Sequence, residues 1–106
     1  MQAPYGDHNP HLSKVVKALA HADSMNVRLH PHAIDRMEER GIDHEDVMLC
    51  LKRGKAYGPE FVKGEWRANV VHRGCAVRVV IGDIEHAAAD WSLLKSFLVV
   101  TVIEAK

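Results

Sequence analysis

The feature that most constrains the fold is a change of hydrophobic period at Gly54. Before Gly54, apolar residues recur at the three- and four-residue spacing of a helix face, and after it they alternate or run continuously, as in strands. Helices followed by strands indicate an α+β domain in which two layers pack together. The 106 residues suffice for one hydrophobic core and are too few for two ordinary domains. We expect one domain over residues 12–106, preceded by a flexible arm over residues 1–11, which are rich in Pro, Gly, Asn and His.

Three helices are expected before the change of period. The first covers residues 12–24, in which apolar side chains repeat at helical spacing. The second covers residues 32–40, because Pro31 is tolerated in a first turn and Gly41 is suited to a C-terminal cap. The third begins after the N-cap residue Asp43 and ends at the glycine where the period changes.

Four strands are expected after the change of period, at residues 56–63, 65–73, 75–81 and 97–103. The first contains Pro59 and is placed at an edge, whereas the last is almost wholly apolar, as a central strand buried on both faces would be. Residues 82–96 form a long connection with a helical turn beginning at Asp90. Residues 26–29 only interrupt the helical pattern. The sequence therefore predicts N-terminal helices packed on a four-stranded antiparallel sheet, in a two-layer sandwich.

The charges balance over the whole chain but not along it. There are 14 Lys and Arg residues and 14 Asp and Glu residues, which argues against indiscriminate binding to nucleic acid. Within residues 52–78, however, seven basic residues stand against Glu60 and Glu65. Such a segment suits phosphates or an acidic protein partner, and it is equally compatible with a solvated face that binds nothing.

Three observations bear on location. No apolar run approaches the roughly 18 residues that a membrane span needs, and residues 1–10 lack the basic and apolar regions of a secretory signal. Cys50 and Cys75 form no Cys-x-x-Cys motif and stand among apolar neighbours, which favours buried free thiols in a reducing compartment. We therefore expect a cytoplasmic protein that makes no contact with a membrane.

The run from His32 to Val47 resembles the signature of a bacterial and phage family, the domain-of-unknown-function family 4258. The run begins with His-Ala, has an Arg and a hydrophobe three residues further on, and continues through Glu-Arg-Gly-Ile to a capping residue and an acidic helix start. The resemblance extends to a Val-Val-Thr-Val sequence at residues 99–102 and covers residues 29–104. It implies a RelE/barnase-like fold and an activity similar to that of small toxin ribonucleases that cleave RNA without a metal. Other relatives of that fold bind a partner without chemistry.

By position, the resemblance puts the family's histidine at His32, its helical arginine at Arg36 and its last-strand threonine at Thr101. RNA cleavage without a metal needs a base for the 2′-hydroxyl, an acid for the leaving 5′-oxygen and cations for the phosphorane charge. Histidine exchanges protons near neutral pH, so His32 is the candidate acid or base. Arg36 and Arg67 would bind phosphate oxygens, and Thr101 would position a phosphate oxygen or the attacking hydroxyl. One departure from the family matters here: residues 82–96 adjoin the sheet's last connection and could cover the face that a substrate needs.

Further residues would extend a substrate-binding face. Arg40 continues the line of His32 and Arg36 at i, i+4 and i+8, which forms one stripe along the second helix. His72 stands at a predicted strand end and Arg78 lies on the next strand, where both could reach a phosphate. The same stripe is compatible with a solvated helix face of exposed ion pairs, or with His32 locking the helix onto the sheet.

A non-catalytic module on the same fold is the alternative function. It would bind a protein partner, such as an antitoxin or an inhibited target. Trp91, in the long connection, is expected to be exposed and to supply a partner contact, because interfaces favour aromatic residues. Trp66 is expected in the core.

No metal or cofactor is expected. The eight histidines include His30 and His32 as a His-x-His pair, but no third and fourth ligands follow at a recognised spacing. The two cysteines are poorly placed to complete a set of ligands.

Overall fold

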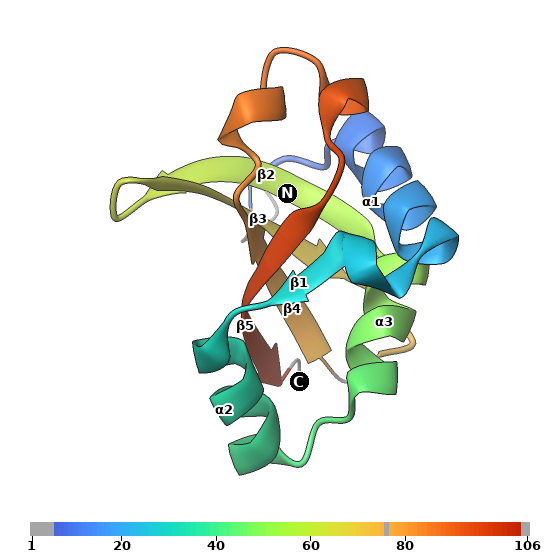
Figure 1. Cartoon of the computed structure of the whole chain (residues 1–106), viewed down its shortest axis with the longest axis vertical. Helices are drawn as coiled ribbons and strands as arrows, with labels where there is room; N and C mark the ends of the chain where they lie inside the picture. Colours follow the sequence, from blue (N-terminus) through green and yellow to red (C-terminus); the bar gives the residue numbers. More distant parts are fainter. Residues whose placement is uncertain (1–5, 76, 105–106) are drawn as a thin grey trace.

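The computed structural model describes residues 6–75 and 77–104, which contain three α-helices and one five-stranded sheet (Figure 1). The helices are α1 (Pro10–Ala22), α2 (Pro31–Arg40) and α3 (His44–Arg53). The strands are β1 (Val27–Leu29), β2 (Lys55–Val62), β3 (Glu65–Val71), β4 (Val77–Gly82) and β5 (Phe97–Glu104). Short 3₁₀ turns are η1 (Ser24–Asn26), η2 (Glu85–Ala87) and η3 (Trp91–Leu93). The expected α+β class is confirmed, and none of the described helices is long and apolar enough to cross a membrane.

The strands follow the order β1-β5-β4-β3-β2. Neighbours among β2 to β5 are antiparallel, whereas β1 runs parallel to the first three residues of β5. The four strands expected after the change of period are present, and β2 lies at an edge as expected. The expected four-stranded antiparallel sheet is nevertheless wrong, because β1 makes it a mixed sheet of five strands. Three residues are too few to show the alternation by which a strand is recognised in a sequence.

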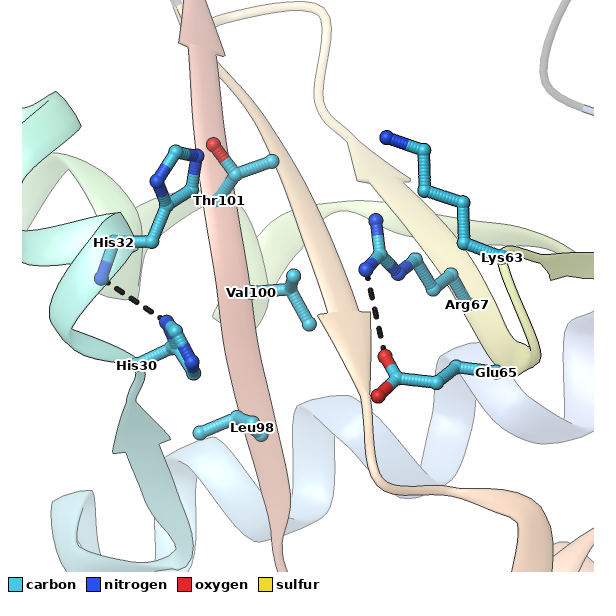
Figure 2. Close-up of a pocket in the computed structure, with 8 residues that line it drawn as sticks. All are labelled: His30, His32, Lys63, Glu65, Arg67, Leu98, Val100 and Thr101. Atoms are coloured by element: carbon cyan, nitrogen blue, oxygen red, sulfur yellow. Dashed lines mark hydrogen bonds and ion pairs between the residues drawn. The ribbon is translucent and has the colours of Figure 1, made fainter.

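The helices α1 and α3 cover one face of the sheet, and the hydrophobic core lies between them and the strands (Figures 1 and 2). Burial along β5 is one-sided: its core-facing residues are buried and those between them are half-buried. The two sets are Phe97, Val99 and Val102, and Leu98, Val100 and Thr101. The expectation that this strand is buried on both faces is therefore wrong, because both helices pack on the same face.

An irregularity in β5 decides which side chains reach the open face. The consecutive β4 residues Val80 and Ile81 lie opposite Thr101 and Val99, which leaves Val100 as an extra residue. A bulge of this kind turns two successive side chains to one side of a strand. Val100 and Thr101 consequently both lie away from the core.

The end of the expected arm lies against β2. The Asn9 backbone N–H donates to the carbonyl of Ala56 at 2.9 Å. The Asn9 side chain accepts a hydrogen bond from the N–H of Leu12 at 3.0 Å, so α1 begins at Pro10, two residues earlier than expected. Residues 1–5 of the expected arm lie outside the described residues.

The ends of α2 and α3 agree with the expected ones. Gly41 follows α2 with a φ of 63°, a conformation that glycine adopts without strain. Asp43 precedes α3, and its backbone N–H donates to the carboxylate of Asp46 at 3.0 Å. The acid also lies near the positive end of the helix, so hydrogen bonding and charge both favour this start.

The two tryptophans have the opposite of their expected environments. Trp91, expected to be exposed, is 8% exposed and packs in the core. It gets there because residues 82–96 fold back beside α1 (Figure 1), and the expected turn does begin at Asp90. Trp66, expected in the core, is 36% exposed, because the β2–β3 hairpin projects beyond the helices (Figure 1).

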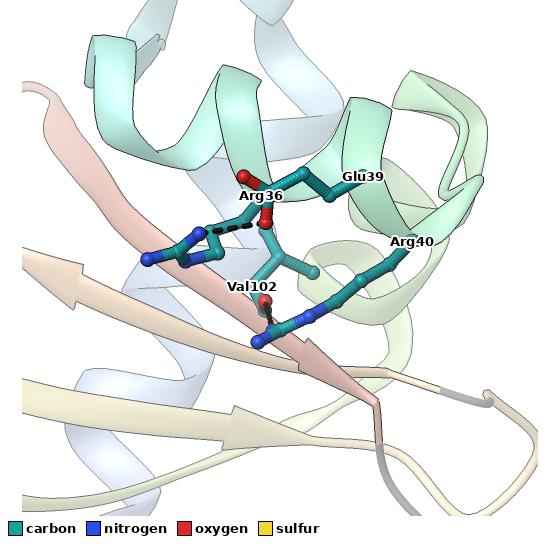
Figure 3. Close-up of polar contacts among 4 residues, drawn as sticks. All are labelled: Arg36, Glu39, Arg40 and Val102. Carbon is teal, nitrogen blue, oxygen red and sulfur yellow. Dashed lines mark hydrogen bonds and ion pairs between the residues drawn. The ribbon is translucent and has the colours of Figure 1, made fainter.

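Helix α2 is fastened to β5 at both ends. Before its start, the backbone N–H of His30 donates to the carbonyl of Val99 at 3.0 Å. At its last residue, the guanidinium of Arg40 donates to the carbonyl of Val102 at 2.6 Å (Figure 3). These two contacts fix the position of the helix along the strand.

We expect Ser13→Ala to destabilise the fold by about 1–3 kcal/mol. Ser13 is 6% exposed, and its hydroxyl accepts a hydrogen bond from the Ala56 N–H at 2.7 Å while donating to the Asn9 carbonyl at 2.8 Å. The substitution leaves a backbone N–H of β2 without this partner. Urea unfolding measures the loss, with Lys14→Ala at the exposed neighbouring position as the control. Equal unfolding free energies for the two variants would contradict this role.

We expect Arg40→Ala to cost about 1–2 kcal/mol of unfolding free energy, because it removes a charged hydrogen bond between α2 and β5. Arg36→Ala is the matched control on the same helix. Among the described residues, Arg36 pairs with Glu39 alone, one turn away at 2.7 Å (Figure 3). An exposed ion pair within one helix contributes less than about 0.5 kcal/mol. Thermal and urea unfolding of both variants measure the difference. A larger loss for Arg36→Ala than for Arg40→Ala would show that the docking contact is misassigned.

Candidate functional site

The open face of the sheet holds a pocket of about 400 Å³ between the start of α2 and the β2–β3 hairpin (Figure 2). It is lined by His30, His32, Lys63, Glu65, Arg67, Leu98, Val100 and Thr101. Three of the residues expected in a catalytic site therefore meet here: His32 from α2, Arg67 from β3 and Thr101 from β5. The long connection over residues 82–96 contributes no lining residue, so it does not cover this face of the described structure.

Two imidazoles stand at the α2 side of the pocket. His30 is the N-cap of α2, and its Nδ1 accepts a hydrogen bond from the backbone N–H of His32 at 3.0 Å. Because Nδ1 is the acceptor, the proton of the neutral His30 ring is assigned to Nε2. The centroids of the two rings are 6.5 Å apart. The His32 side chain is exposed and makes no hydrogen bond within the described residues, so its ring is open to a ligand.

The opposite side of the pocket carries two cations and one acid. Arg67 lies on β3 and donates from one terminal nitrogen to Glu65 at 3.4 Å, while its Nε is buried without a partner among the described residues. Lys63 belongs to the turn before β3, with a φ of 51°. Figure 2 shows Thr101 beside His32, and Arg67 with Lys63 across the pocket from them. A single acid thus faces two basic side chains.

The predicted helix stripe does not enter the pocket as a whole. Residues four apart on a helix differ by about 40° in direction, and residues eight apart by about 80°. His32 accordingly lines the pocket, whereas Arg36 pairs with Glu39 and Arg40 binds the backbone of β5. The alternative role of His32 was to hold the helix on the sheet through a hydrogen bond. No hydrogen bond joins the His32 side chain to Thr101 in the described structure, so no observed contact supports that role.

The other two predicted phosphate contacts lie further along the sheet. The guanidinium of Arg78 donates to the side-chain oxygen of Asn69, on the neighbouring strand β3. His72 follows β3, and its Nδ1 accepts a hydrogen bond from the N–H of Gly74 at 3.0 Å. Neither residue lines the pocket that contains His32.

Both cysteines are free thiols. Burial raises the pKa of the Cys50 thiol to about 12, and burial also raises the pKa of the Cys75 thiol, so both favour the protonated form. Neither cysteine lines the pocket. Within residues 6–75 and 77–104, no three His, Cys, Asp or Glu side chains gather in a way that could hold a metal ion.

The sequence-based reasoning missed His30, Lys63 and Glu65 as pocket residues. His30 had a usable signal: a proline at the first helical position makes the residue before it the N-cap, next to the helix start that carries His32. Lys63 and Glu65 had none, because their distance from α2 depends on how far the β2–β3 hairpin reaches across the sheet. The assembled groups are an open imidazole, a ring with an assigned N–H, an ammonium, a guanidinium paired with the Glu65 carboxylate, and a hydroxyl. They suit an anion that undergoes proton transfer, such as a phosphodiester.

Comparison with known proteins gives one match. No curated protein and no solved structure matches the chain. A family model described as a domain of unknown function, DUF4258, matches residues 29–104. The matched range runs from the end of β1 through the last strand and contains every residue that lines the pocket, while α1 lies outside it. The chain therefore belongs to the DUF4258 family.

Proposed function

We propose that the protein is a metal-independent endoribonuclease that acts on single-stranded RNA in the pocket of His32. The observation that carries this proposal is the combination of an open imidazole with two cations across one pocket. Transfer of a phosphoryl group to the 2′-hydroxyl needs a base and an acid on opposite sides of the phosphorus, with cations between them. His32, with Thr101 beside it, and Lys63, with Arg67 beside it, lie on opposite sides of the pocket (Figure 2).

In this mechanism His32 takes the proton of the 2′-hydroxyl. The 2′-oxygen forms a bond to phosphorus as the bond to the 5′-oxygen breaks, and the 5′-oxygen takes a proton from the ammonium of Lys63. The products are a 2′,3′-cyclic phosphate and a free 5′-hydroxyl. Arg67 binds the non-bridging oxygens on which charge develops, and the Nε2–H of His30 donates to the same group. Thr101 positions the attacking hydroxyl or a phosphate oxygen.

A RelE/barnase-like architecture and a toxin role belong to the same proposal. In support, α1 and α3 pack on one face of the antiparallel strands β2 to β5, and the opposite face bears the pocket. A cleaving toxin would slow the growth of a bacterial host that expresses it. The His32→Ala variant would then be tolerated at the same expression level.

We expect His32→Ala to lower RNA cleavage by about 100-fold or more and to leave the melting temperature unchanged, because the exposed side chain makes no hydrogen bond within the described residues. A quenched fluorescent RNA oligonucleotide in EDTA measures the rate, and the DNA oligonucleotide of the same sequence, which lacks the 2′-hydroxyl, remains intact. His21→Ala, at an exposed position of α1, is the control. If the wild-type protein, in excess over the RNA, leaves the RNA intact both with EDTA and with divalent ions, the proposal fails.

A substrate with sulfur in place of the bridging 5′-oxygen separates the two proton transfers, since a thiolate leaves without protonation. We expect Lys63→Asn to cleave this substrate at the wild-type rate while cleaving the oxygen substrate at least about 100-fold more slowly. Asparagine is chosen because it tolerates the positive φ at this position. His32→Ala should cleave both substrates slowly. Equal losses on both substrates for Lys63→Asn would remove the lysine from the role of acid.

A different observation supports a second function, the binding of a protein partner. Phe61 and Trp66 are 63% and 36% exposed, and their rings pack edge to face on the projecting hairpin, 5.5 Å between centroids. We assign the partner contact to these two residues and not to Trp91, because Trp91 is buried. A stoichiometric partner captured from host lysate should be lost with the double variant Phe61→Ser/Trp66→Ser and retained with Met25→Ser, another exposed hydrophobic position. Capture that is the same for all three proteins would count against this function.

A further inference from the structure

A second concave site lies at the other end of β2 and β3. It has a volume of about 440 Å³ and is lined by Arg53, Lys55, Tyr57, Val71, His72 and Arg73. We call it the cationic pocket. Its three charged residues come from three separate places: the end of α3, the start of β2 and the turn after β3. None of the residues that line it is acidic.

The cations of this pocket are not neutralised within the described structure. The ion pairs among the described residues join Arg28 to Asp83, Arg36 to Glu39 and Arg67 to Glu65, all at other places. The chain carries equal numbers of basic and acidic residues, so three unpaired cations at one concavity are a local excess of charge. A helix dipole accounts for a cation at the end of α3, and protection of an edge strand accounts for a lysine on β2. Neither explains why both meet a third cation around one hollow.

The donors of the cationic pocket match a phosphate. Guanidinium groups bind phosphate through two parallel hydrogen bonds, and Arg53 and Arg73 supply two such groups. The Nδ1 of His72 is occupied as an acceptor from Gly74, which assigns the proton of the neutral ring to Nε2 and makes it a further donor. Tyr57 adds a half-buried aromatic ring, one side of which contacts the ring of His8 at 5.7 Å between centroids, and bases of single-stranded nucleic acid stack on side chains of this kind.

The open face of β3 connects this site to the pocket of His32. Arg67 lines the first pocket and Val71 lines the second, and alternate residues of a strand share one face. Four residues of strand span about 13 Å, so one extended nucleic-acid strand can reach both sites. Between them, Arg78 of β4, which lies opposite Val71, donates its hydrogen bond to the side-chain oxygen of Asn69 on β3.

We propose that the cationic pocket binds a backbone phosphate of the single-stranded RNA whose scissile phosphate lies in the pocket of His32. The pocket is thus a substrate subsite that holds the strand away from the point of cleavage. This inference rests on the proposed function in so far as it calls the RNA a substrate. The binding of RNA to the cationic pocket does not itself require that cleavage occurs.

Binding is measured first, on the His32→Ala protein, with a fluorescent RNA decamer and anisotropy over a range of salt concentrations. The double variant Lys55→Gln/Arg73→Gln should bind the RNA at least about tenfold more weakly. The slope of the logarithm of its binding constant against the logarithm of salt concentration should be smaller in magnitude by about 1.4, as expected when two contacts to single-strand phosphates are lost. Both positions are exposed, so the fold is retained. The matched control is Lys14→Gln/Lys17→Gln on α1, which removes the same charge elsewhere. An equal loss in the two double variants would overturn the proposal, because it would show only an effect of net charge.

Cleavage assays test the subsite independently on the otherwise wild-type protein. The variant Lys55→Gln/Arg73→Gln should raise KM for a decamer with little change in kcat, and should leave kcat/KM for a dinucleotide unchanged, since a dinucleotide cannot span both pockets. If the double variant binds RNA more weakly but the wild-type protein cleaves none, the subsite is supported and the ribonuclease activity is disproved. If the double variant cleaves the decamer with the KM of the wild type, the ribonuclease activity is supported and the subsite is disproved.

If a labelled decamer of glutamate binds as tightly as RNA, the pocket binds an acidic protein and the proposal is wrong.

Discussion

The attachment of α2 to β5 is the constraint on which the candidate site depends. The helix follows directly from β1, and the ladder between β1 and β5 continues into the hydrogen bond from His30 to Val99. At the other end Arg40 holds the backbone of Val102. With both ends held, the first turn of α2 can only lie beside the middle of β5. This is why the imidazoles of His30, just before the helix, and His32, in its first turn, line the same pocket as the hydroxyl of Thr101 on the strand.

The parts of the fold that could be predicted from the sequence are those decided by local chemistry. Gly41 and Asp43 mark helix ends through backbone conformation and capping, which act within a few residues. The residues of β4 predicted to face the core, Val77, Val79 and Ile81, are likewise buried, and Arg78 between them is half-buried, although the outward-facing Val80 is buried as well. Strand β1 could not be predicted, since its three residues become a strand only through their partner some seventy positions later. The environments of Trp66 and Trp91 depend in the same way on which distant elements extend far enough to cover them.

The candidate site shows the same division. His32 was predicted from the family resemblance and the proton chemistry of imidazole, and Arg67 from its charge on a predicted strand, and both line the pocket. The arginines further along α2 do not, because a repeat of four residues drifts away from a repeat of 3.6. Lys63 belongs to a turn, and nothing in a sequence says how far a turn reaches across a sheet. The register of β2 and β3 supplies that information, and register is a property of the folded chain.

The bulge in β5 lets two neighbouring residues do what one residue of a regular strand would have to do: pack against the next strand and present a polar group to the pocket. Between Val99 and Val102, a regular strand with the same buried positions would offer one outward side chain, and the extra residue provides a second. Val100 fills the space above Gly82, where a Cβ built on the glycine would stand 2.9 Å from a methyl of that valine. The neighbouring place is thereby left to Thr101. The hydroxyl can accordingly be exchanged for another group, in evolution or in the laboratory, without opening a hole in the molecule.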